Sequence, residues 1–164
     1  LEIERFDRIV HSNKEGQLGM VSLECVIAEF ISYPDNWAHA ADRLSQENLL
    51  SDTDSKLLKL RLAYSRCIGN SDTHNGNVSL FLNGTNLNGL TPAYDILPMA
   101  YMPSKADLPN PAIKITRPNF IDDETWQKAQ LLGLKFWKRV TNESRISIDF
   151  HAIAKQWVEQ LEQQ

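Results

Sequence analysis

The stretch Ile68–Asn77 reads IGNSDTHNGN, and Pro92–Leu97, PAYDIL, follows it along the chain. The first stretch, called the polar turn below, gathers Asp, His and Asn side chains around two glycines. The preceding segment, 55–68, is apolar on most sides and predicts the central helix of the fold, which Gly69 is suited to end. A strand is predicted over 78–82. The polar turn therefore lies between a central helix and a hairpin.

The predicted hairpin indicates which polar side chains meet. Asn-Gly pairs after the first strand are turn signals, and a returning strand is predicted over 90–94. Folding the chain back about residue 86 without slippage places Asn77 beside Asp95. Asp72 precedes the hairpin at the same end. Carboxylate and amide oxygens suit Mg²⁺, so we expect Asn77 and Asp95 to reach one metal ion, with Asp72 close to them.

The rest of the pattern is mainly helical. Residues 1–8 read as a strand, 10–19 as a polar turn-rich link, and 97–111, with four prolines, as an irregular loop. Capping residues before apolar periodicity predict four more helices: 23–30 after Ser22, 37–49 after Asp35, one after Asp122 or Asp123, and one after Asp149. We therefore expect a mainly α (α+β) fold that forms a single domain over residues 1–164.

Composition narrows the function. The chain has 164 residues, 42% hydrophobic, with a net charge of -4, so it carries no basic footprint for nucleic acid. Cys25 and Cys67 make no disulfide framework, and Cys67 is expected to be a buried thiol. No apolar run spans a bilayer and no signal peptide is visible, so we expect a cytoplasmic protein without membrane contact. The sequence lacks an initiator Met and opens within a strand pattern, which indicates part of a longer chain.

The spacing within the polar turn is typical of phosphoryl transfer. Asp72 and Asn77 are five positions apart, as are the Asp and Asn of the protein-kinase catalytic loop H-R-D-x-x-x-x-N. In that loop the Asp accepts the proton of the substrate hydroxyl, the Asn binds a metal, and a second Asp after a hairpin binds metal again. Here the His follows the Asp, which gives D-x-H-x-x-N.

Three ordered motifs, ERFDR at 4–8, IGNSDTHNGN at 68–77 and LTPAYDILP at 90–98, resemble the C-terminal lobe of HipA-like serine/threonine protein kinases, the toxins of type II toxin–antitoxin systems. The resemblance implies a hinge strand over 1–8, a catalytic turn and hairpin over 69–97, and C-terminal helices over 121–164. It also implies roles for individual residues: Glu4, Arg5 and Phe6 in the hinge that receives adenine, Asp72 as the catalytic Asp, His74, Asn75, Gly76 and Asn77 in the nucleotide-contacting turn, and Tyr94 and Asp95 in the Tyr-Asp pair.

The resemblance further implies ATP and Mg²⁺ as cofactors, a protein Ser or Thr as phosphoryl acceptor, and a HipB-like antitoxin as partner. The family's phosphate-binding loop and nucleotide Lys belong to an N-terminal lobe, which these residues do not include, so we expect the segment alone to be inactive. Asp95 is followed by Ile-Leu instead of the Phe-Gly of ordinary protein kinases. That departure argues against a DFG-type flip and leaves metal binding untouched.

Other interpretations use the same residues. SDTHNG also resembles the first metal motif of calcineurin-like phosphoesterases, which leaves a metal-dependent phosphoesterase or nuclease as the main rival. A non-catalytic docking domain is a third. The Asp and Asn residues could simply be turn formers. His74 fits a nucleotide contact or a brace for the loop about equally well, and Tyr94 fits packing better than ligand binding.

Overall fold

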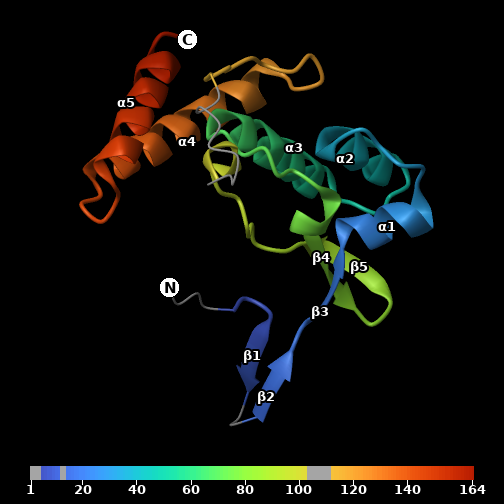
Figure 1. The fold of residues 1–164 in the computed structure, drawn as a ribbon. Helices are drawn as coiled ribbons and strands as arrows, with labels where there is room; N and C mark the ends of the chain where they lie inside the picture. The colour runs from blue at the N-terminus through green and yellow to red at the C-terminus, as the bar shows by residue number, and fades with distance from the viewer. Residues whose placement is uncertain (1–4, 12–13, 103–111) are drawn as a thin grey trace. The chain divides into compact units, whose positions relative to one another are not determined.

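A computed structural model describes residues 5–11, 14–102 and 112–164. The chain forms two compact units (Figure 1). Unit 1 comprises 1–58 and 74–95, and unit 2 comprises 59–73 and 96–164. The described residues contain five α-helices and two small antiparallel sheets, which confirms an α+β fold. None of the helices in these ranges combines the length and apolar character needed to cross a bilayer.

The helices of unit 1 begin at local capping residues. Helix α1, Leu23–Phe30, starts as predicted after Ser22, whose Oγ accepts a hydrogen bond from the N–H of Cys25. Helix α2, Trp37–Gln46, is capped by Asn36, not by the predicted Asp35. The Asn36 side-chain oxygen accepts from two backbone N–H groups and so satisfies donors that the first helical turn leaves open.

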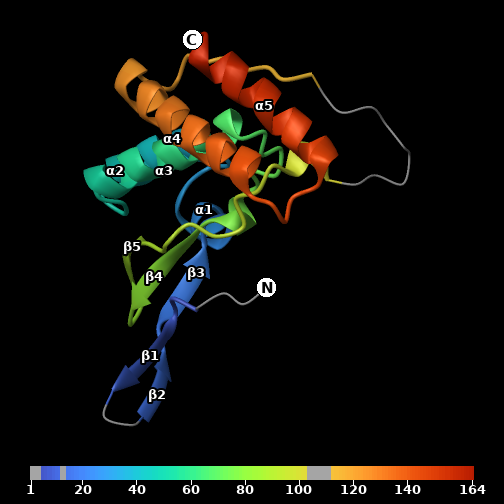
Figure 2. The same ribbon diagram turned by 90° about the vertical axis from the view of Figure 1, so that its left-hand side faces the viewer.

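The strands of unit 1 form two sheets (Figure 2). Strands β1, Arg8–His11, and β2, Lys14–Gln17, make a two-stranded ladder, while β3, Gly19–Ser22, pairs with β4, Ser79–Asn83, which pairs with β5, Asn86–Leu90. The prediction of a turn-rich link over 10–19 was therefore wrong, and residues 6–7, expected within a strand, form a turn. Strand β3 gains its partner from a segment far along the chain, and local propensity does not register such pairing.

The hairpin register also differs from the prediction. The chain turns at Gly84–Thr85 between paired Asn83 and Asn86, and an irregularity then brings Leu80 opposite Leu90. The returning strand thus ends where it was expected to begin. The ladder does not pair Asn77 with Asp95, because both lie beyond its last paired residues.

Unit 2 is helical. Helix α3, Asp52–Cys67, begins in unit 1 and ends in unit 2. Helix α4, Asp123–Asn142, starts after the predicted cap Asp122 and lies beside α5, Ile148–Glu162 (Figure 2). The cap of α5 is Ser147, not the predicted Asp149. A short 3₁₀ helix, Met99–Tyr101, interrupts the expected irregular loop, the remainder of which lies mostly outside the described residues.

The core of unit 2 forms around the end of α3. The Trp137 ring is fully buried, stacks on Trp157 at a centroid distance of 5.2 Å, and donates a hydrogen bond from Nε1 to the Cys67 carbonyl. Cys67 is itself buried as predicted, and burial raises the pKa of its thiol to about 12. This thiol is therefore unsuited to act as a nucleophile at neutral pH.

Gly133 allows α4 to approach α3 closely, and its replacement should be costly. A Cβ at this position would lie 2.7 Å from the Cys67 Cβ and 3.1 Å from its carbonyl oxygen. Gly133→Ala should therefore lower the free energy of unfolding by about 1–3 kcal/mol through overpacking, although Ala favours a helix by about 1 kcal/mol. Urea unfolding followed by tryptophan fluorescence measures this change. Lys135→Ala, at an exposed position of the same helix, is the control, and stabilisation by Gly133→Ala would contradict the packing described.

Candidate functional site

The first half of the polar turn, residues 68–73, is built on the end of α3 in unit 2. Gly69, at a φ of 71°, ends the helix, and the N–H of Asn70 donates to the Ser65 carbonyl. These features form a Schellman motif, the usual glycine-based helix end. The buried Asn70 side chain then accepts a hydrogen bond from the Asp72 backbone N–H at 2.9 Å. The backbone of Asp72 is thus fixed relative to the helix end, and its side chain is half-buried.

The second half of the polar turn lies in unit 1 and closes on His74. The Nδ1 atom of His74 accepts the Gly76 N–H at 3.0 Å, and the His74 carbonyl accepts the Asn77 N–H at 3.1 Å. A Cβ on Gly76 would lie 2.9 Å from the imidazole ring, so a larger residue at this position would displace the ring from this hydrogen bond. His74 therefore braces the short 3₁₀ helix Asn75–Asn77, and the Asn77 side chain is buried at its end.

Tyr94 holds the segment after the hairpin against this turn. Its hydroxyl donates to the Gly76 carbonyl at 3.1 Å and lies 2.7 Å from the Ser79 Oγ. Because a phenol carries one proton, Ser79 is the donor in the second bond. The sequence favoured simple packing for Tyr94, but its polar end makes two specific hydrogen bonds. Asp95, the next residue, is exposed and adopts a φ of 53°.

Loss of the Tyr94 hydroxyl should loosen the turn selectively. Tyr94→Phe keeps the ring but leaves the Ser79 hydroxyl and the Gly76 carbonyl without this partner, at a cost of about 1–3 kcal/mol in unfolding free energy. Faster amide hydrogen exchange at Gly76 and Asn77 should accompany the loss. Tyr101→Phe is the matched control: it deletes a hydroxyl that accepts from the Trp157 indole in unit 2 and should leave exchange at these two amides unchanged. Equal exchange in the wild type and Tyr94→Phe would show that the hydroxyl does not hold the turn.

Phe6 joins the predicted hinge to this arrangement. Its ring lies 6.1 Å from that of Tyr94 in a stacked orientation and 6.1 Å from that of Phe81 edge-on. Such pairs add stability beyond their buried area. Three residues assigned by resemblance to separate motifs, Phe6, Gly76 and Tyr94, therefore form one continuous set of contacts within unit 1.

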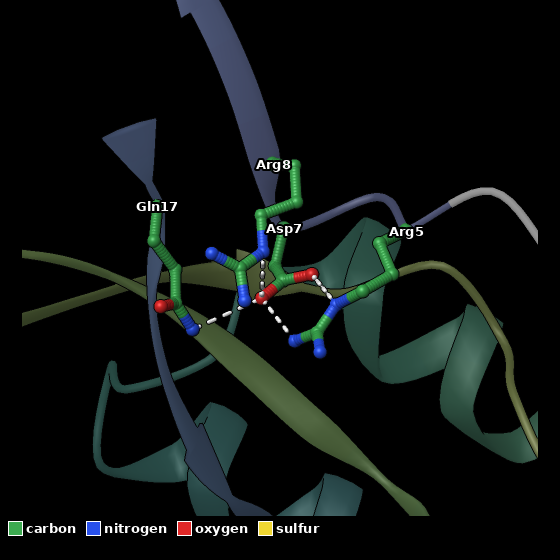
Figure 3. A network of polar contacts seen from close by, with 4 residues as sticks. All are labelled: Arg5, Asp7, Arg8 and Gln17. Carbon is green, nitrogen blue, oxygen red and sulfur yellow. Dashed lines mark hydrogen bonds and ion pairs between the residues drawn. The ribbon is translucent and has the colours of Figure 1, made fainter. Parts of the chain in front are cut away.

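The neighbouring hinge residues form a polar network around Asp7 (Figure 3). Arg5 donates to both Asp7 carboxylate oxygens, from Nε at 2.8 Å and from Nη2 at 2.6 Å, and Gln17 on β2 donates to Oδ2 at 3.0 Å. The Arg8 Nε lies 3.9 Å from the same oxygen. Asp7 thus links the hinge to β2, and the Arg5 side chain holds the Asp7 carboxylate in place. Glu4, the other predicted hinge residue, lies outside the described residues.

This network makes part of the stability dependent on pH. The hydrogen bonds from Arg5 hold the pKa of Asp7 below its ordinary value of 3.8. A lowered folded-state pKa stabilises the protein above the unfolded value, and this stabilisation is lost as the pH falls through the folded value. In melting experiments, the difference between wild type and Asp7→Asn should be constant near neutrality and shrink below about pH 4. Asp149→Asn, at an exposed acid in the first turn of α5, is the control, and a pH-independent difference for Asp7→Asn would contradict the pairing.

The predicted site residues are divided between the two units. His74, Asn75, Gly76, Asn77, Tyr94 and Asp95 all lie in unit 1, and Asp72 lies in unit 2. Within the described ranges no three His, Cys, Asp or Glu side chains cluster as metal ligands. The oxygens of Asn77 and Asp95 are of the kind that Mg²⁺ takes alongside water and phosphate. Their joint reach to one ion stays a prediction.

Some residues of the site were missed in the sequence. Ser79 precedes Leu80 on β4, so the two side chains lie on opposite faces of the strand and Ser79 is a polar position on one of them. Gln17 lies within 10–19, for which the sequence predicts a turn-rich link. Asn70 directly follows the helix-ending Gly69, where Asn is common as a turn former. Each of these three positions carries a recognisable sequence signal, but none of the signals identifies the residue to which the side chain is hydrogen-bonded.

The structure is an α+β domain in which a D-x-H-x-x-N turn follows the end of a helix. A Tyr-Asp pair after a hairpin is hydrogen-bonded to that turn. The family model described as HipA-like C-terminal domain matches residues 1–164. The chain belongs to this family.

A curated relative matches this chain over nearly its whole length. Toxin YjjJ of Escherichia coli (strain K12) is 38% identical to this chain over 164 residues, which are 99% of this chain and 36% of the relative. The chain therefore spans little more than a third of the length of that protein.

Proposed function

We propose that this chain is the C-terminal catalytic lobe of a HipA-like serine/threonine protein kinase, which transfers the γ-phosphoryl group of ATP to a protein Ser or Thr as the toxin of a toxin–antitoxin pair. The observation that carries the proposal is the Tyr94 hydroxyl on the Gly76 carbonyl. This contact ties the Tyr-Asp segment to the turn that bears Asn77, and kinases need their two metal-binding residues close together.

Each polar residue has a distinct role in this proposal. Asp72 orients the acceptor hydroxyl and takes its proton, while Asn77 and Asp95 hold Mg²⁺. The metal ion, when bound, neutralises charge on the phosphates. Chemistry of this type relies on positioning and charge stabilisation. The rigid support of Asp72 by Asn70, and of Asn77 by His74, suits that requirement.

The hinge contributes a site for adenine. Because the Arg5 guanidinium is engaged by Asp7, the hinge would present its backbone and the Phe6 ring to the base. The Phe6 ring is already oriented by its stacking on Tyr94. The proposal includes a HipB-like antitoxin as partner, as the family resemblance implies, and the cytoplasm as compartment, as expected from the sequence without a visible signal peptide.

The geometry of His74 argues against a phosphoesterase. Its Nδ1 atom accepts the Gly76 N–H, so this nitrogen already serves to brace the turn. A two-metal phosphoesterase would instead use the His of this motif as a metal ligand.

Thermal unfolding of the full-length protein with ligands tests the proposal. Mg·ATP at about a hundred times its Kd should add about 2.7 kcal/mol of stability, and ATP with EDTA clearly less. Stabilisation by Mn²⁺ alone that ATP does not enhance would favour a phosphoesterase. No response to metal or nucleotide would favour a docking domain.

A further inference from the structure

Helix α4 has one buried face and a second face that lines an open groove. Trp126, Ala129, Gly133, Trp137 and Val140 form the buried face. Other side chains line an open groove along the helix and at its end: Leu131, Leu134, Lys135, Lys138, Arg139, Asn142 and Glu143. Their spacing of three and four residues makes them one continuous stripe, called the α4 groove below.

The N-terminal end of the α4 groove is apolar. Leu131 is 69% exposed. The other large apolar residues of the groove and of the buried face of α4 are less exposed. Leu134 lies beside it, one helical turn further on and half-buried. A single exposed leucine is ordinary on a protein surface, so the distinguishing feature of this groove is that two leucines are contiguous with its charged residues.

The C-terminal end of the groove is cationic. Lys135, Lys138 and Arg139 fall within five residues of a chain whose net charge is -4. Lys138 already binds a carboxylate, since its Nζ lies 2.6 Å from an oxygen of Glu162. In the part of the chain that the structure describes, Lys135 and Arg139 have no ion-pair partner.

Glu143, which also lines the groove, does not cancel the positive charges of Lys135 and Arg139. Arg145 donates to both of its carboxylate oxygens at 2.8 Å, and this pairing lowers the pKa of Glu143 to about 2. Glu143 is thus ionised at neutral pH and already neutralised by Arg145. The positive charge of Lys135 and Arg139 remains available to another group.

We propose that the α4 groove binds an acidic amphipathic peptide segment of a partner protein. Leu131 and Leu134 would receive an apolar side chain of the peptide, and Lys135 and Arg139 would receive its carboxylates. The leucines favour a peptide over nucleic acid, because a phosphate backbone gains nothing from them. The proposal does not depend on phosphoryl transfer.

Fluorescence anisotropy tests this surface on the full-length protein. The probe is a labelled synthetic helical peptide with Leu at every third or fourth position and Glu at the others. The double variant Lys135→Glu/Arg139→Glu should weaken binding by about tenfold or more, since it replaces two attractive pairs by repulsive ones. Lys114→Glu/Lys155→Glu changes the net charge equally at exposed positions outside the groove and should change affinity by less than about twofold.

Two further comparisons complete the test. Leu131→Ser leaves the charge unchanged and should also weaken peptide binding, while the melting temperature stays that of the wild type. A peptide with Lys in place of Glu should bind more weakly than the Glu peptide. The proposal is overturned if the two double variants bind the Glu peptide with equal affinity, or if the Lys peptide binds as tightly as the Glu peptide. It is also overturned if a DNA duplex displaces the peptide from the wild type and binds more weakly to Lys135→Glu/Arg139→Glu.

Discussion

Asp72→Asn should nearly abolish phosphoryl transfer by the full-length protein while leaving Mg·ATP affinity intact. The substitution keeps the size and some of the hydrogen bonding of the side chain but removes the base. Transfer should fall by about two to four powers of ten, the usual share of general-base catalysis. The hydrogen bond between Asn70 and residue 72 should survive, because it uses the backbone N–H of that residue.

The control for this experiment is another acid of the same type. Asp149→Asn replaces an exposed carboxylate in the first turn of α5 and should change neither transfer nor affinity. Binding of Mg·ATP is measured by calorimetry, and transfer with radiolabelled ATP. Loss of bound metal in Asp72→Asn would mean that Asp72 is a metal ligand, as in a phosphoesterase, and would reverse the assignment.

Asp95→Asn should weaken nucleotide binding as well as turnover. Removing a charged ligand lowers the affinity of the site for Mg²⁺. We expect Mg·ATP affinity to fall by at least about tenfold, because losing even a residue that only hydrogen-bonds to a metal ligand typically costs that much metal affinity. Asn tolerates the left-handed backbone that Asp95 adopts, so the backbone should be unaffected.

A comparison with alanine separates charge from backbone. Asp95→Ala removes the same charge and adds backbone strain at a φ of 53°, so it should lower the melting temperature more than Asp95→Asn does. Both variants should lose nucleotide affinity to a similar extent. If Asp95→Asn keeps wild-type Mg·ATP affinity, Asp95 is not a metal ligand.

Elements whose signals are local could be predicted from the sequence. Helix α1 has its predicted bounds because Ser22 caps it directly, and Asp122 does the same for α4. The predicted caps Asp35 and Asp149 were wrong, although the helices exist, because a neighbouring Asn or Ser fits the capping position. Local sequence locates a helix more reliably than it chooses between adjacent capping residues.

Pairing between distant segments could not be predicted. The hairpin was expected to turn about residue 86, but a tight turn at Gly84–Thr85 and an irregularity after it set another register. Strand β3 depends on β4, and the sequence around it contains no sign of that partner. Register and pairing follow from tertiary contacts, which a single sequence does not contain.

The candidate site shows the same division. The spacing of Asp72 and Asn77 was visible in the polar turn, and the family resemblance linked Phe6 and Tyr94 to it. The contacts that join them, from Tyr94 to Gly76 and Ser79 and from Asp7 to Arg5 and Gln17, appear only in the folded chain.

Phosphoryl transfer from radiolabelled ATP is the most direct test of the proposed kinase. The full-length protein, incubated with Mg²⁺ and radiolabelled ATP, should place label on Ser or Thr residues of protein, and EDTA or Asp72→Asn should abolish it. Phosphoamino-acid analysis identifies the acceptor. Release of inorganic phosphate from phosphoester substrates without any protein-bound label would contradict the account.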